Sequence, residues 1–440
     1  MAPKRRALNS FDALLGLQPM MGALLCALPV LAGTREAAHG GPPVLALLGS
    51  LLAHPLAALF LLQASYFAIE TWLWLRYRPI EAGPTEGLPR LSVIIPAYNE
   101  GPMVERSIRS VAKADYPRDR LEILVVDDGS RDDTFFHMEQ LRREFPGLVR
   151  LIRFRGNQGK RAALCTGFRA STGDVLLTID SDSEIEPGTL RAMVAPFQFD
   201  ERIGGVAGRV RVLNRERLIG AMLDVHYALT FDFGRAAQSV FRAVACCPGA
   251  LSAFRREAIL HQLDEWTQQR FLGRPVSHGE DQALTNLVLR SNYDTVYQRT
   301  AVVQTLAPQH YQQLCRMFLR WDRSYIVEGF SFAKFMFKRF RSDHRVLPIV
   351  HFLVGNLRLA MLYVGLLCLP ALVLAHPGSL WRVAWSLFIA GTFTALYYLR
   401  SDRSLRFVYG ILYAFYSALL LQWILPWALV TVRDERWGTR

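Results

Sequence analysis

The stretch DVLLTIDSD (174–182) decides the fold of the middle of this chain, because an apolar strand runs directly into an acidic cluster. Two similar stretches precede it, LSVIIPAYNE (91–100) and LEILVVDDG (121–129). Each begins with a continuous apolar run, which is typical of a strand buried on both faces of a parallel sheet. Segments that read as helices separate them. The pattern therefore predicts an α/β domain with a mostly parallel sheet and helices on both faces.

Polar side chains cluster where three of the predicted strands end. We expect strands at 91–98, 121–129, 149–154 and 174–182, and helices at 101–114, 132–145 and 159–170, within an alternating region that extends over 91–310. In an open sheet of this kind the ligand lies beyond the carboxyl ends of the strands. Those ends carry Asn99–Glu100, Asp127–Asp128 and Asp180–Ser181–Asp182. The sequence therefore predicts a functional site at that edge of the sheet.

Apolar segments flank this domain on both sides. The chain has 440 residues, of which 51% are hydrophobic, and a mean hydropathy of +0.15, values that exclude a disordered chain. A signal peptide is one interpretation of the first apolar segment, and a membrane span is the other. We predict an α-helical transmembrane bundle built from the segments 13–33, 56–76, 348–374, 380–398 and 405–432.

Basic residues beside the apolar segments predict their orientation. Lys4–Arg6 precede the first segment, and Arg76 and Arg78 follow the second, which places the central domain in the cytoplasm. The last segment either crosses once or folds back as a re-entrant pair broken near Gln422 or Pro426. We favour the return, because it keeps the basic tail, and so both termini, in the cytoplasm.

Charge and cysteine content restrict the surroundings of the protein. The net charge is +13, from 51 Lys and Arg against 38 Asp and Glu. Such a balance suits anionic lipid headgroups or phosphorylated substrates, and we expect membrane lipid but no nucleic acid as a partner. FAKFMFKRF (332–340) reads as a helix lying in the membrane surface, with an ordinary packing helix as the alternative. The six cysteines form no CxxC pair, which favours a reducing compartment.

The acidic cluster at 180–182 indicates a divalent cation. Asp180 and Asp182 are two residues apart, so both side chains can leave one side of a strand end. Mg²⁺ and Mn²⁺ prefer oxygen ligands and often keep substrate phosphates in their coordination shell. A solvated turn is the structural alternative. We predict a Mg²⁺ or Mn²⁺ ion that offsets the charge of a diphosphate.

Further motifs carry groups for anion binding and proton transfer. Asp127 and Asp128 suit hydrogen bonds to a nucleoside, with a helix N-cap as the alternative. GNQGKR (156–161) opens a helix with two cations and favours an anion such as a nucleotide. Asp281 could take a proton from a sugar hydroxyl, or cap the helix that follows it. Arg320–Trp321 could clamp phosphate and stack on a sugar, or anchor the chain at the headgroups.

Together these motifs resemble the membrane-bound, processive glycosyltransferases of family 2, whose nucleotide-sugar-binding domain is of the GT-A type. The resemblance covers the chain from about residue 90 to its C-terminus, and its most specific part is FLGRPVSHGEDQALTN (271–286). That string, RAAQS (235–239) and WGTR (437–440) are similar to hyaluronan synthases and rhizobial chitin-oligosaccharide synthases in particular. The general family motifs are IIPAYNE (94–100), VVDDGS (125–130), GNQGKR (156–161), DSD (180–182), GED (279–281) and RW (320–321).

The resemblance implies a role for each matching residue. Asp281 would be the catalytic base, with Glu280 beside it, and Asp182 would bind the metal. The tail 437–440 would close over the donor, which requires it to be cytoplasmic. The implied acceptor-side residues are Trp321, Cys247 and Gly249. The implied nucleotide-sugar contacts are Pro96, Tyr98, Glu100, Asp127, Asp128, Lys160, Asp180, Arg320, Trp437 and Arg440.

Two positions depart from the family pattern. The family has a glutamine three residues before the arginine of its RW motif, and this chain has Met317 there. CCPGALS (246–252) places proline before glycine, where hyaluronan synthases tend to have glycine before proline. Both departures lie on the acceptor side of the predicted site.

The resemblance also implies an activity and a division of the chain. The implied reaction is inverting, processive β-transfer from UDP-GlcNAc, with UDP-GlcA as a second donor, to a growing polysaccharide that the same chain exports. The alternatives are chitin-oligosaccharide synthesis from UDP-GlcNAc alone, transfer of one sugar to a lipid carrier, and a channel or binding module without activity. We predict a membrane region at 1–79, a GT-A domain at 80–310, interface helices at 311–345, a transmembrane bundle at 346–432 and a cytoplasmic tail at 433–440.

Overall fold

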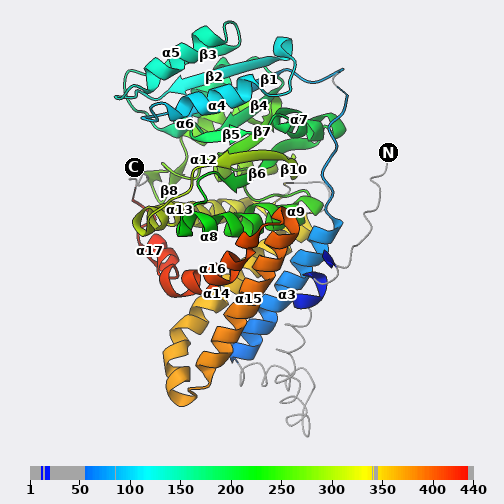
Figure 1. Cartoon of the computed structure of the whole chain (residues 1–440), viewed down its shortest axis with the longest axis vertical. Coiled ribbons are helices and arrows are strands. Elements are labelled where there is room, and N and C mark those ends of the chain that lie inside the picture. The colour runs from blue at the N-terminus through cyan, green and yellow to red at the C-terminus, as the bar shows by residue number, and fades with distance from the viewer. Residues whose placement is uncertain are drawn as a thin grey trace. The chain divides into compact units, whose positions relative to one another are not determined.

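The computed structural model describes residues 11–12, 15–19, 55–84, 86–338, 340 and 345–434 of the chain. The chain divides into two compact units. One contains Met1–Tyr77 and Val346–Leu420, and the other contains Arg78–Arg345 and Leu421–Arg440. Figure 1 shows the helices and strands of both.

A mixed sheet of eight strands forms the centre of the second unit, in the order β3-β2-β1-β4-β7-β6-β10-β5 within the described residues. The strands β1, β2, β3 and β4 are parallel to one another, and β6 is parallel to β10. Strand β7 lies between β4 and β6 and is antiparallel to both, so the group β1–β4 runs in the same direction as β6 and β10. Strand β5 is antiparallel to β10. The mostly parallel sheet predicted from the sequence is therefore confirmed. Its strands are β1 (Leu91–Ala97), β2 (Leu121–Asp127), β3 (Val149–Arg153), β4 (Val175–Ile179), β5 (Ser183–Ile185), β6 (Ile203–Val212), β7 (Leu251–Arg255) and β10 (Asp294–Thr305).

Helices pack on both faces of this sheet. Helices α4 (Met103–Ala112) and α5 (Thr134–Glu144) connect β1 to β2 and β2 to β3, in one direction across the sheet. Helix α6 (Lys160–Ala170) connects β3 to β4 and so runs in the opposite direction, past β2 and β1. Because crossovers between parallel strands are right-handed, α4 and α5 lie on one face of the sheet and α6 lies on the other. All of β1 is buried, as its apolar run predicts. The four strands and three helices expected between residues 91 and 182 are thus present.

The rest of this unit consists of shorter elements and one long helix. The further helices are α7 (Thr189–Phe199), α8 (Leu218–Tyr227), α9 (Arg235–Val240), α10 (Arg256–Ile259), α11 (Leu263–Thr267), α12 (Glu280–Arg290), α13 (Tyr311–Phe335) and α17 (Ile424–Val430). The minor elements are the π-helix η2 (Ala228–Gly234), the 3₁₀ turns η1 (Arg118–Arg120) and η3 (Leu260–Gln262), and the hairpin of β8 (Arg270–Phe271) and β9 (Arg274–Pro275).

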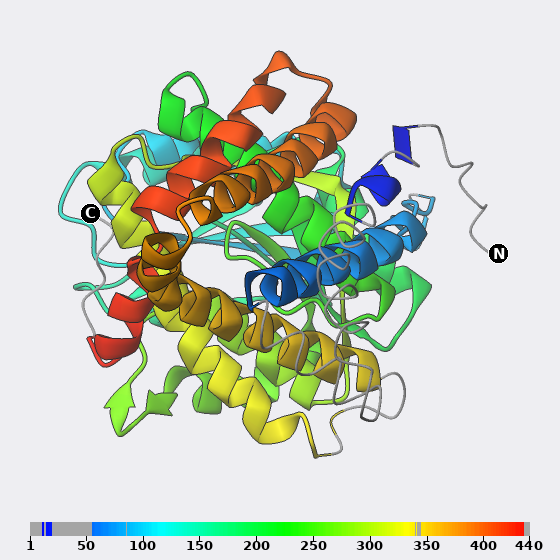
Figure 2. The same cartoon turned by 90° about the horizontal axis from the view of Figure 1, so that it is seen from below.

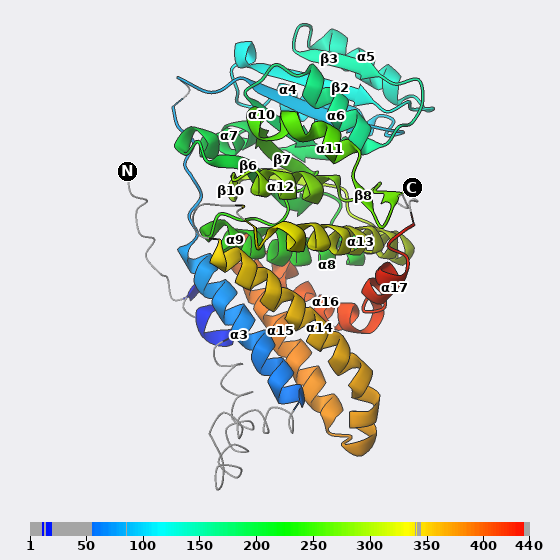
Figure 3. The ribbon, with the colours of Figure 1, turned by 180° about the vertical axis from the view of Figure 1, so that it is seen from behind.

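Helix α13 organises one side of this unit. It packs against α12, and Figure 3 shows the two helices side by side. Helix α17 packs along α13, where Trp423 Nε1 donates a hydrogen bond of 3.1 Å to the Tyr311 hydroxyl. The helix expected at 332–340 differs from the structure: its first residues are the last turn of α13, and a turn follows at 336–338.

Long apolar helices form the other unit. They are α3 (Pro55–Arg76), α14 (Val346–Ala375), α15 (Ser379–Asp402), the short η4 (Leu405–Val408) and α16 (Tyr409–Leu420). Helix α3 packs against α14, and α15 packs against α16 (Figure 2). Among the described residues of this unit, Glu70 Oε1 is 2.7 Å from His351 Nε2, and Arg400 Nε is 2.8 Å from Asp12 Oδ1. Such pairing offsets the cost of ionisable groups in apolar surroundings.

Helix α14 is long and apolar enough to cross a membrane. The segments Leu405–Leu420 and Ile424–Val430 are long and apolar enough only when they are taken together, and they are bent by 44° at the break between them, which includes Gln422. Helices α3 and α15, which occupy the predicted spans 56–76 and 380–398, are not among these segments. Of the predicted span 13–33, only residues 15–19 are described. The number of crossings and the orientation stay predictions.

Candidate active site

The predicted edge of the sheet gathers loops from both parallel and antiparallel strands. The carboxyl ends of β1 and β2 are level, since Ala97 pairs with Asp127. Strand β7 runs against β4, and Ile179 at the end of β4 pairs with Leu251 at the start of β7. The loop 246–250 therefore lies at the same edge as the acidic clusters that follow β1, β2 and β4.

Asp127 and Asp128, at the end of β2, hold two loops in place. Asp127 is completely buried; its Oδ1 accepts a hydrogen bond of 2.9 Å from the Ser130 backbone N–H, and its Oδ2 lies 3.1 Å from Nε of Arg153. Asp128 accepts hydrogen bonds of 2.7 and 2.9 Å from the backbone N–H groups of 158–159. Through these two hydrogen bonds Asp128 fixes the loop that leads into α6. Burial raises the pKa of the Asp128 carboxyl.

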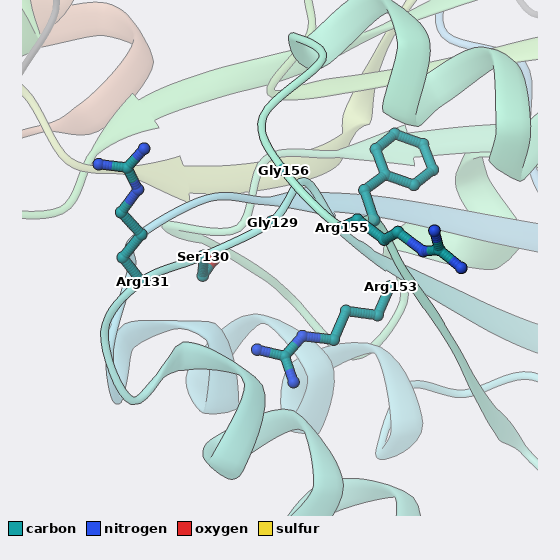
Figure 4. A pocket seen from close by; sticks show the side chains of 7 residues that line it. Gly129, Ser130, Arg131, Arg153, Arg155 and Gly156 are labelled. Atoms are coloured by element: carbon teal, nitrogen blue, oxygen red, sulfur yellow. The ribbon is translucent and has the colours of Figure 1, made fainter.

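A pocket of about 450 Å³ opens beside Asp127 at the ends of β2 and β3. Figure 4 shows the guanidinium groups of its three arginines spread around Ser130 rather than converging on one point. Gly129 has a φ of +73°, and a Cβ there would lie 2.5 Å from Cα of Gly156, so only glycine lets the two loops meet. The arginines were missed by the sequence prediction, although RFR (153–155) at a strand end marks two of them. The lining residues are Gly129, Ser130, Arg131, Arg153, Phe154, Arg155 and Gly156.

Lys160, the first residue of α6, joins acidic groups from two other elements. Its Nζ lies 2.6 Å from Asp180 Oδ1 and 3.0 Å from Glu280 Oε1. Burial disfavours the charged amine, but the nearby carboxylates outweigh it and raise the pKa of Lys160. Lys160 in turn lowers the pKa of Glu280 against the effect of burial. The structure thus brings together three residues predicted from three separate motifs.

Gly249 lies against this cluster. A Cβ at this position would lie 2.8 Å from Nζ of Lys160, 3.6 Å from Oδ1 of Asp180 and 3.7 Å from Oε1 of Glu280. The loop before β7 therefore approaches the charged groups by its backbone. Any larger residue would push the lysine aside.

Asp281, the second residue of α12, is held by backbone donors. Its Oδ2 accepts a hydrogen bond of 3.1 Å from the Gly249 N–H and lies 3.7 Å from Sγ of Cys246, while its Oδ1 accepts one of 2.8 Å from the Gln282 N–H. Burial and the charge of Glu280 raise the pKa of Asp281. Adjacent carboxyls whose pKa values are pushed apart suit different roles. Asp281 suits a proton acceptor, and Glu280 suits a fixed anion that holds Lys160.

Asp182 follows β4 and offers a carboxylate for a metal. Its Oδ1 accepts hydrogen bonds from the Ser183 hydroxyl at 3.3 Å and the Thr305 hydroxyl at 3.4 Å. Among the described residues, no three His, Cys, Asp or Glu side chains are placed to hold a metal together. Mg²⁺ is often bound by one or two carboxylates and takes its other ligands from substrate phosphates and water. Asp182 fits a cation of that kind, and the described residues do not fit a metal held by protein alone.

Helix α13 contributes Arg320 and Trp321. The positive charges of Lys160 and Arg320 both lower the pKa of Glu280. Met317, at the position of the family's glutamine, is buried and accepts a hydrogen bond of 3.6 Å from the Tyr227 hydroxyl. It therefore supports an aromatic cluster from inside. In that cluster the ring centroid of Trp321 lies 6.0 Å from Tyr227, 5.7 Å from Phe231 and 5.5 Å from Phe318.

The residues predicted from IIPAYNE (94–100) differ in access. Pro96 is buried within β1, whereas Tyr98 just after it is 37% exposed. The backbone N–H of Glu100 donates a hydrogen bond of 2.8 Å to the Thr134 hydroxyl. Tyr98 is therefore the most accessible of the three predicted side chains.

Cys247 belongs to the loop 246–250 at this edge of the sheet, but its side chain is buried. Its side chain has no exposed surface, and its backbone N–H donates a hydrogen bond of 2.9 Å to the Thr285 hydroxyl. Its neighbours Cys246 and Gly249, rather than Cys247 itself, contact Asp281. The two remaining predicted positions, Trp437 and Arg440, lie outside the described residues.

Comparison with known proteins places these features in a wider group. Residues 92–262 match the sequence profile named Glycosyl transferase family 2. An N-acetylglucosaminyltransferase of Azorhizobium caulinodans is 32% identical over 360 residues, which cover 80% of this chain and 87% of that protein. A hyaluronan synthase of Streptococcus pyogenes is 30% identical over 385 residues, which cover 86% and 88% respectively.

One solved structure extends the comparison to the fold. The mannosyltransferase PcManGT of Pyrobaculum calidifontis, in complex with GDP-Man and Mn²⁺, superposes with a TM-score of 0.58 at 23% identity. The match covers 83% of this chain and 99% of that one. It shows a shared fold and confirms the predicted GT-A-type architecture.

Proposed function

This chain belongs to glycosyltransferase family 2, and on that premise we propose that it is a membrane-embedded, processive, inverting β-glycosyltransferase of the hyaluronan synthase type. It uses UDP-GlcNAc and UDP-GlcA to extend a polysaccharide and exports the product, with its catalytic unit in the cytoplasm. One observation carries the proposal. Lys160 lies within ion-pair distance of both Asp180 and Glu280, and the three residues come from three separate motifs. Asp281 adjoins this cluster because it accepts a hydrogen bond from Gly249, which lies against the cluster.

The reaction follows from the charges of these groups. The acceptor hydroxyl attacks the anomeric carbon of the donor, its proton passes to Asp281, and the bond from that carbon to the UDP oxygen breaks. A single displacement of this kind inverts the anomeric carbon. Lys160 and Arg320 place positive charge beside the departing diphosphate, which is electrostatic stabilisation of developing charge. Asp182 would hold a Mg²⁺ or Mn²⁺ ion, which supplies further charge neutralisation when bound.

Two features beside the reacting groups are assigned to the uridine end of the donor and to the acceptor sugar. The arginine-rimmed pocket beside Asp127 is the proposed place of the uridine end, because a planar base and a nearby phosphate suit an open cationic rim. The cluster around Trp321 is the proposed place of the acceptor sugar, since aromatic faces stack on sugar rings. Helix α14 supports embedding in a membrane.

A second candidate function is synthesis of short chitin oligosaccharides from UDP-GlcNAc alone. The relative named N-acetylglucosaminyltransferase, at 32% identity, favours it as much as the hyaluronan synthase relative favours the first. Both share the donor site and Asp281, so product analysis must separate them.

Turnover of radiolabelled donors by the purified protein tests the proposal. A long polymer that needs both UDP-GlcNAc and UDP-GlcA is the expected result. Short oligomers from UDP-GlcNAc alone would establish the second candidate, and a lipid-extractable product would indicate transfer of one sugar to a carrier. Absence of any sugar transfer would contradict all three.

We expect Gly249→Ala to weaken UDP binding while the protein stays folded. The new methyl group would lie 2.8 Å from Nζ of Lys160, which must move away from Asp180 and Glu280. Isothermal titration with UDP measures the change, for which we expect about a tenfold rise in Kd. Gly188→Ala is the matched control, because nothing lies within 4 Å of its added methyl group. Equal affinity in the two variants would contradict the contact.

The rate of transfer is expected to fall on acidification earlier than an ordinary carboxylate would cause. Asp281 must be ionised to accept a proton, and burial together with Glu280 raises its pKa. Its inactive, protonated form therefore accumulates at a higher pH than for an aspartate of pKa about 3.9. Glu280→Gln removes the like charge and should move this acid limb to lower pH. Profiles of kcat/KM against pH for both proteins measure the limb, and one that Glu280→Gln leaves in place would contradict the assignment.

A further inference from the structure

A buried polar network connects helices α12 and α13 behind the reacting groups. Glu328 on α13 is only 1% exposed. Its Oε1 accepts a hydrogen bond of 2.6 Å from Gln269 Nε2, and its Oε2 accepts one of 2.8 Å from Asn286 Nδ2 on α12. The same Asn286 amide also donates to the Glu328 backbone carbonyl at 3.1 Å. One carboxylate therefore ties α13 to α12 and to the loop before β8.

Arg161 extends this network to α6. Its Nη1 donates hydrogen bonds of 2.8 Å to Gln269 Oε1 and 2.7 Å to the Trp266 carbonyl. Its Nη2 donates one of 3.4 Å to the His278 carbonyl, just before α12. Arg161 is itself buried, so these fixed acceptors hold it in one position.

The network residues share their helices with the groups of the active site. The pairs are Arg161 and Lys160 on α6, Asn286 and Glu280–Asp281 on α12, and Glu328 and Arg320–Trp321 on α13. Trp266 adds a link, because its Nε1 donates a hydrogen bond of 3.0 Å to the Glu280 carbonyl. The relative position of the three helices therefore sets the relative position of the reacting groups.

The contact between α12 and α13 leaves little freedom near Asp281. A Cβ on Gly279 would lie 2.0 Å from the Ser324 hydroxyl oxygen, and that hydroxyl donates to Gln282 Oε1 at 3.2 Å. A shift of α13 along α12 would therefore carry Arg320–Trp321 away from Asp281. A carboxylate suits position 328 because two amide N–H₂ groups point at it, and a glutamine there would offer only one acceptor oxygen.

We propose that Glu328 is a positioning residue for glycosyl transfer. It holds α13 against α12 and α6, and so sets the acceptor-side Trp321 and the cation Arg320 relative to Asp281. This inference deepens the proposed function, on which it rests. Glu328 was not predicted from the sequence, and Asn286 explains one residue of the specific string 271–286 that the reaction itself does not use.

Exchange of an acid and an amide across this contact tests the proposal. Glu328→Gln places an N–H₂ group against that of Gln269 or Asn286, which breaks one hydrogen bond. In the double variant Gln269→Glu/Glu328→Gln, the carboxylate at position 269 accepts from Arg161 and from the amide at 328, whose oxygen still accepts from Asn286. Every donor then has an acceptor again.

The readout is the fate of UDP-GlcNAc in the full-length protein purified in detergent. We expect Glu328→Gln to lower sugar transfer by about tenfold and to raise the share of donor hydrolysed by water, while the Kd for UDP rises by no more than about threefold, because Lys160 is unchanged and only Arg320 shifts. The double variant should return to within about threefold of the unaltered protein. Glu265→Gln is the matched control, because it makes the same change in a side chain that is 59% exposed and pairs with Arg290 on α12.

Several results would overturn the proposal. One is an unchanged ratio of hydrolysis to transfer in Glu328→Gln, after correction for the fraction of protein that binds UDP. Another is a double variant no more active than the single one, and a third is failure of both to fold, which would make the network purely structural. Absence of transfer by the unaltered protein would instead contradict the proposed function, so the two failures are distinguishable.

Discussion

We expect Asp281→Asn to abolish sugar transfer and to leave the affinity for UDP within about threefold of that of the unaltered protein. The substitution removes the group that accepts the proton of the attacking hydroxyl, and general base catalysis contributes about 10² to 10⁴-fold. UDP binding should persist because Lys160, Asp180 and Glu280 are unchanged. Donor turnover and isothermal titration with UDP measure the two quantities separately.

The design of this experiment must allow for the hydrogen bonds of Asp281. Asparagine has one acceptor oxygen, whereas the carboxylate accepts from both the Gly249 and the Gln282 backbone N–H groups. A cost of about 1 kcal/mol in stability is therefore expected, and a thermal melt should show it. Asp264→Asn is the matched control, because that side chain is 78% exposed. Retained elongation in Asp281→Asn would reject its role as the base.

Lys160→Met is expected to abolish donor binding and to destabilise the protein. Methionine keeps an unbranched apolar chain as far as the position of Cε and removes the ammonium group that lies 2.6 Å from Asp180 and 3.0 Å from Glu280. Loss of one partner from a buried pair costs about 3 to 5 kcal/mol, and the lower value applies here because Asp180 is partly solvated. Titration with UDP and the thermal midpoint measure the two effects.

The pH dependence of this destabilisation gives an independent check. Because the pKa of Glu280 is lowered in the folded protein, its ionisation stabilises the fold above the usual pKa of about 4.3 and loses this effect as the pH falls through the lowered value. The deficit of Lys160→Met should therefore be largest near neutral pH and shrink in acid. Adding Glu280→Gln should restore stability but not activity. A deficit that is independent of pH would mean that the amine packs there without pairing.

The order of strands and helices in the catalytic unit was predictable from local pattern. The apolar runs at 91–97, 121–127 and 175–179 allow little besides buried strands, and the acidic residues after them mark the carboxyl ends. The mostly parallel direction followed from the helices between them. The antiparallel insertion of β7 did not, because the sequence of a short buried strand does not encode its direction.

In the candidate site, too, local sequence pattern indicates some residues, and only the fold reveals the contacts of others. Asp127, Asp180 and Asp182 stand out in the sequence because they follow apolar strands at equivalent ends, and Asp281 stands out because it lies in the specific string 271–286. The partners of Lys160 do not stand out, since they are distant in the chain and meet only when β4 and α12 pack. In the fold the Asp128 carboxylate accepts hydrogen bonds from backbone N–H groups and the Cys247 side chain is buried, and the substrate contacts predicted for both stay predictions.

The linear chain alone determined which chemistry is available: acidic and basic side chains at strand and helix ends, between apolar segments. Local physics suffices for that, because strand burial, helix starts and hydropathy depend on residues close together. Only the tertiary structure decided which of these side chains touch. It separated Glu280 from Asp281 in pKa, and it placed Glu328 behind the reacting groups. Contacts between residues far apart in the chain depend on the packing of whole helices and strands, which no short stretch of sequence contains.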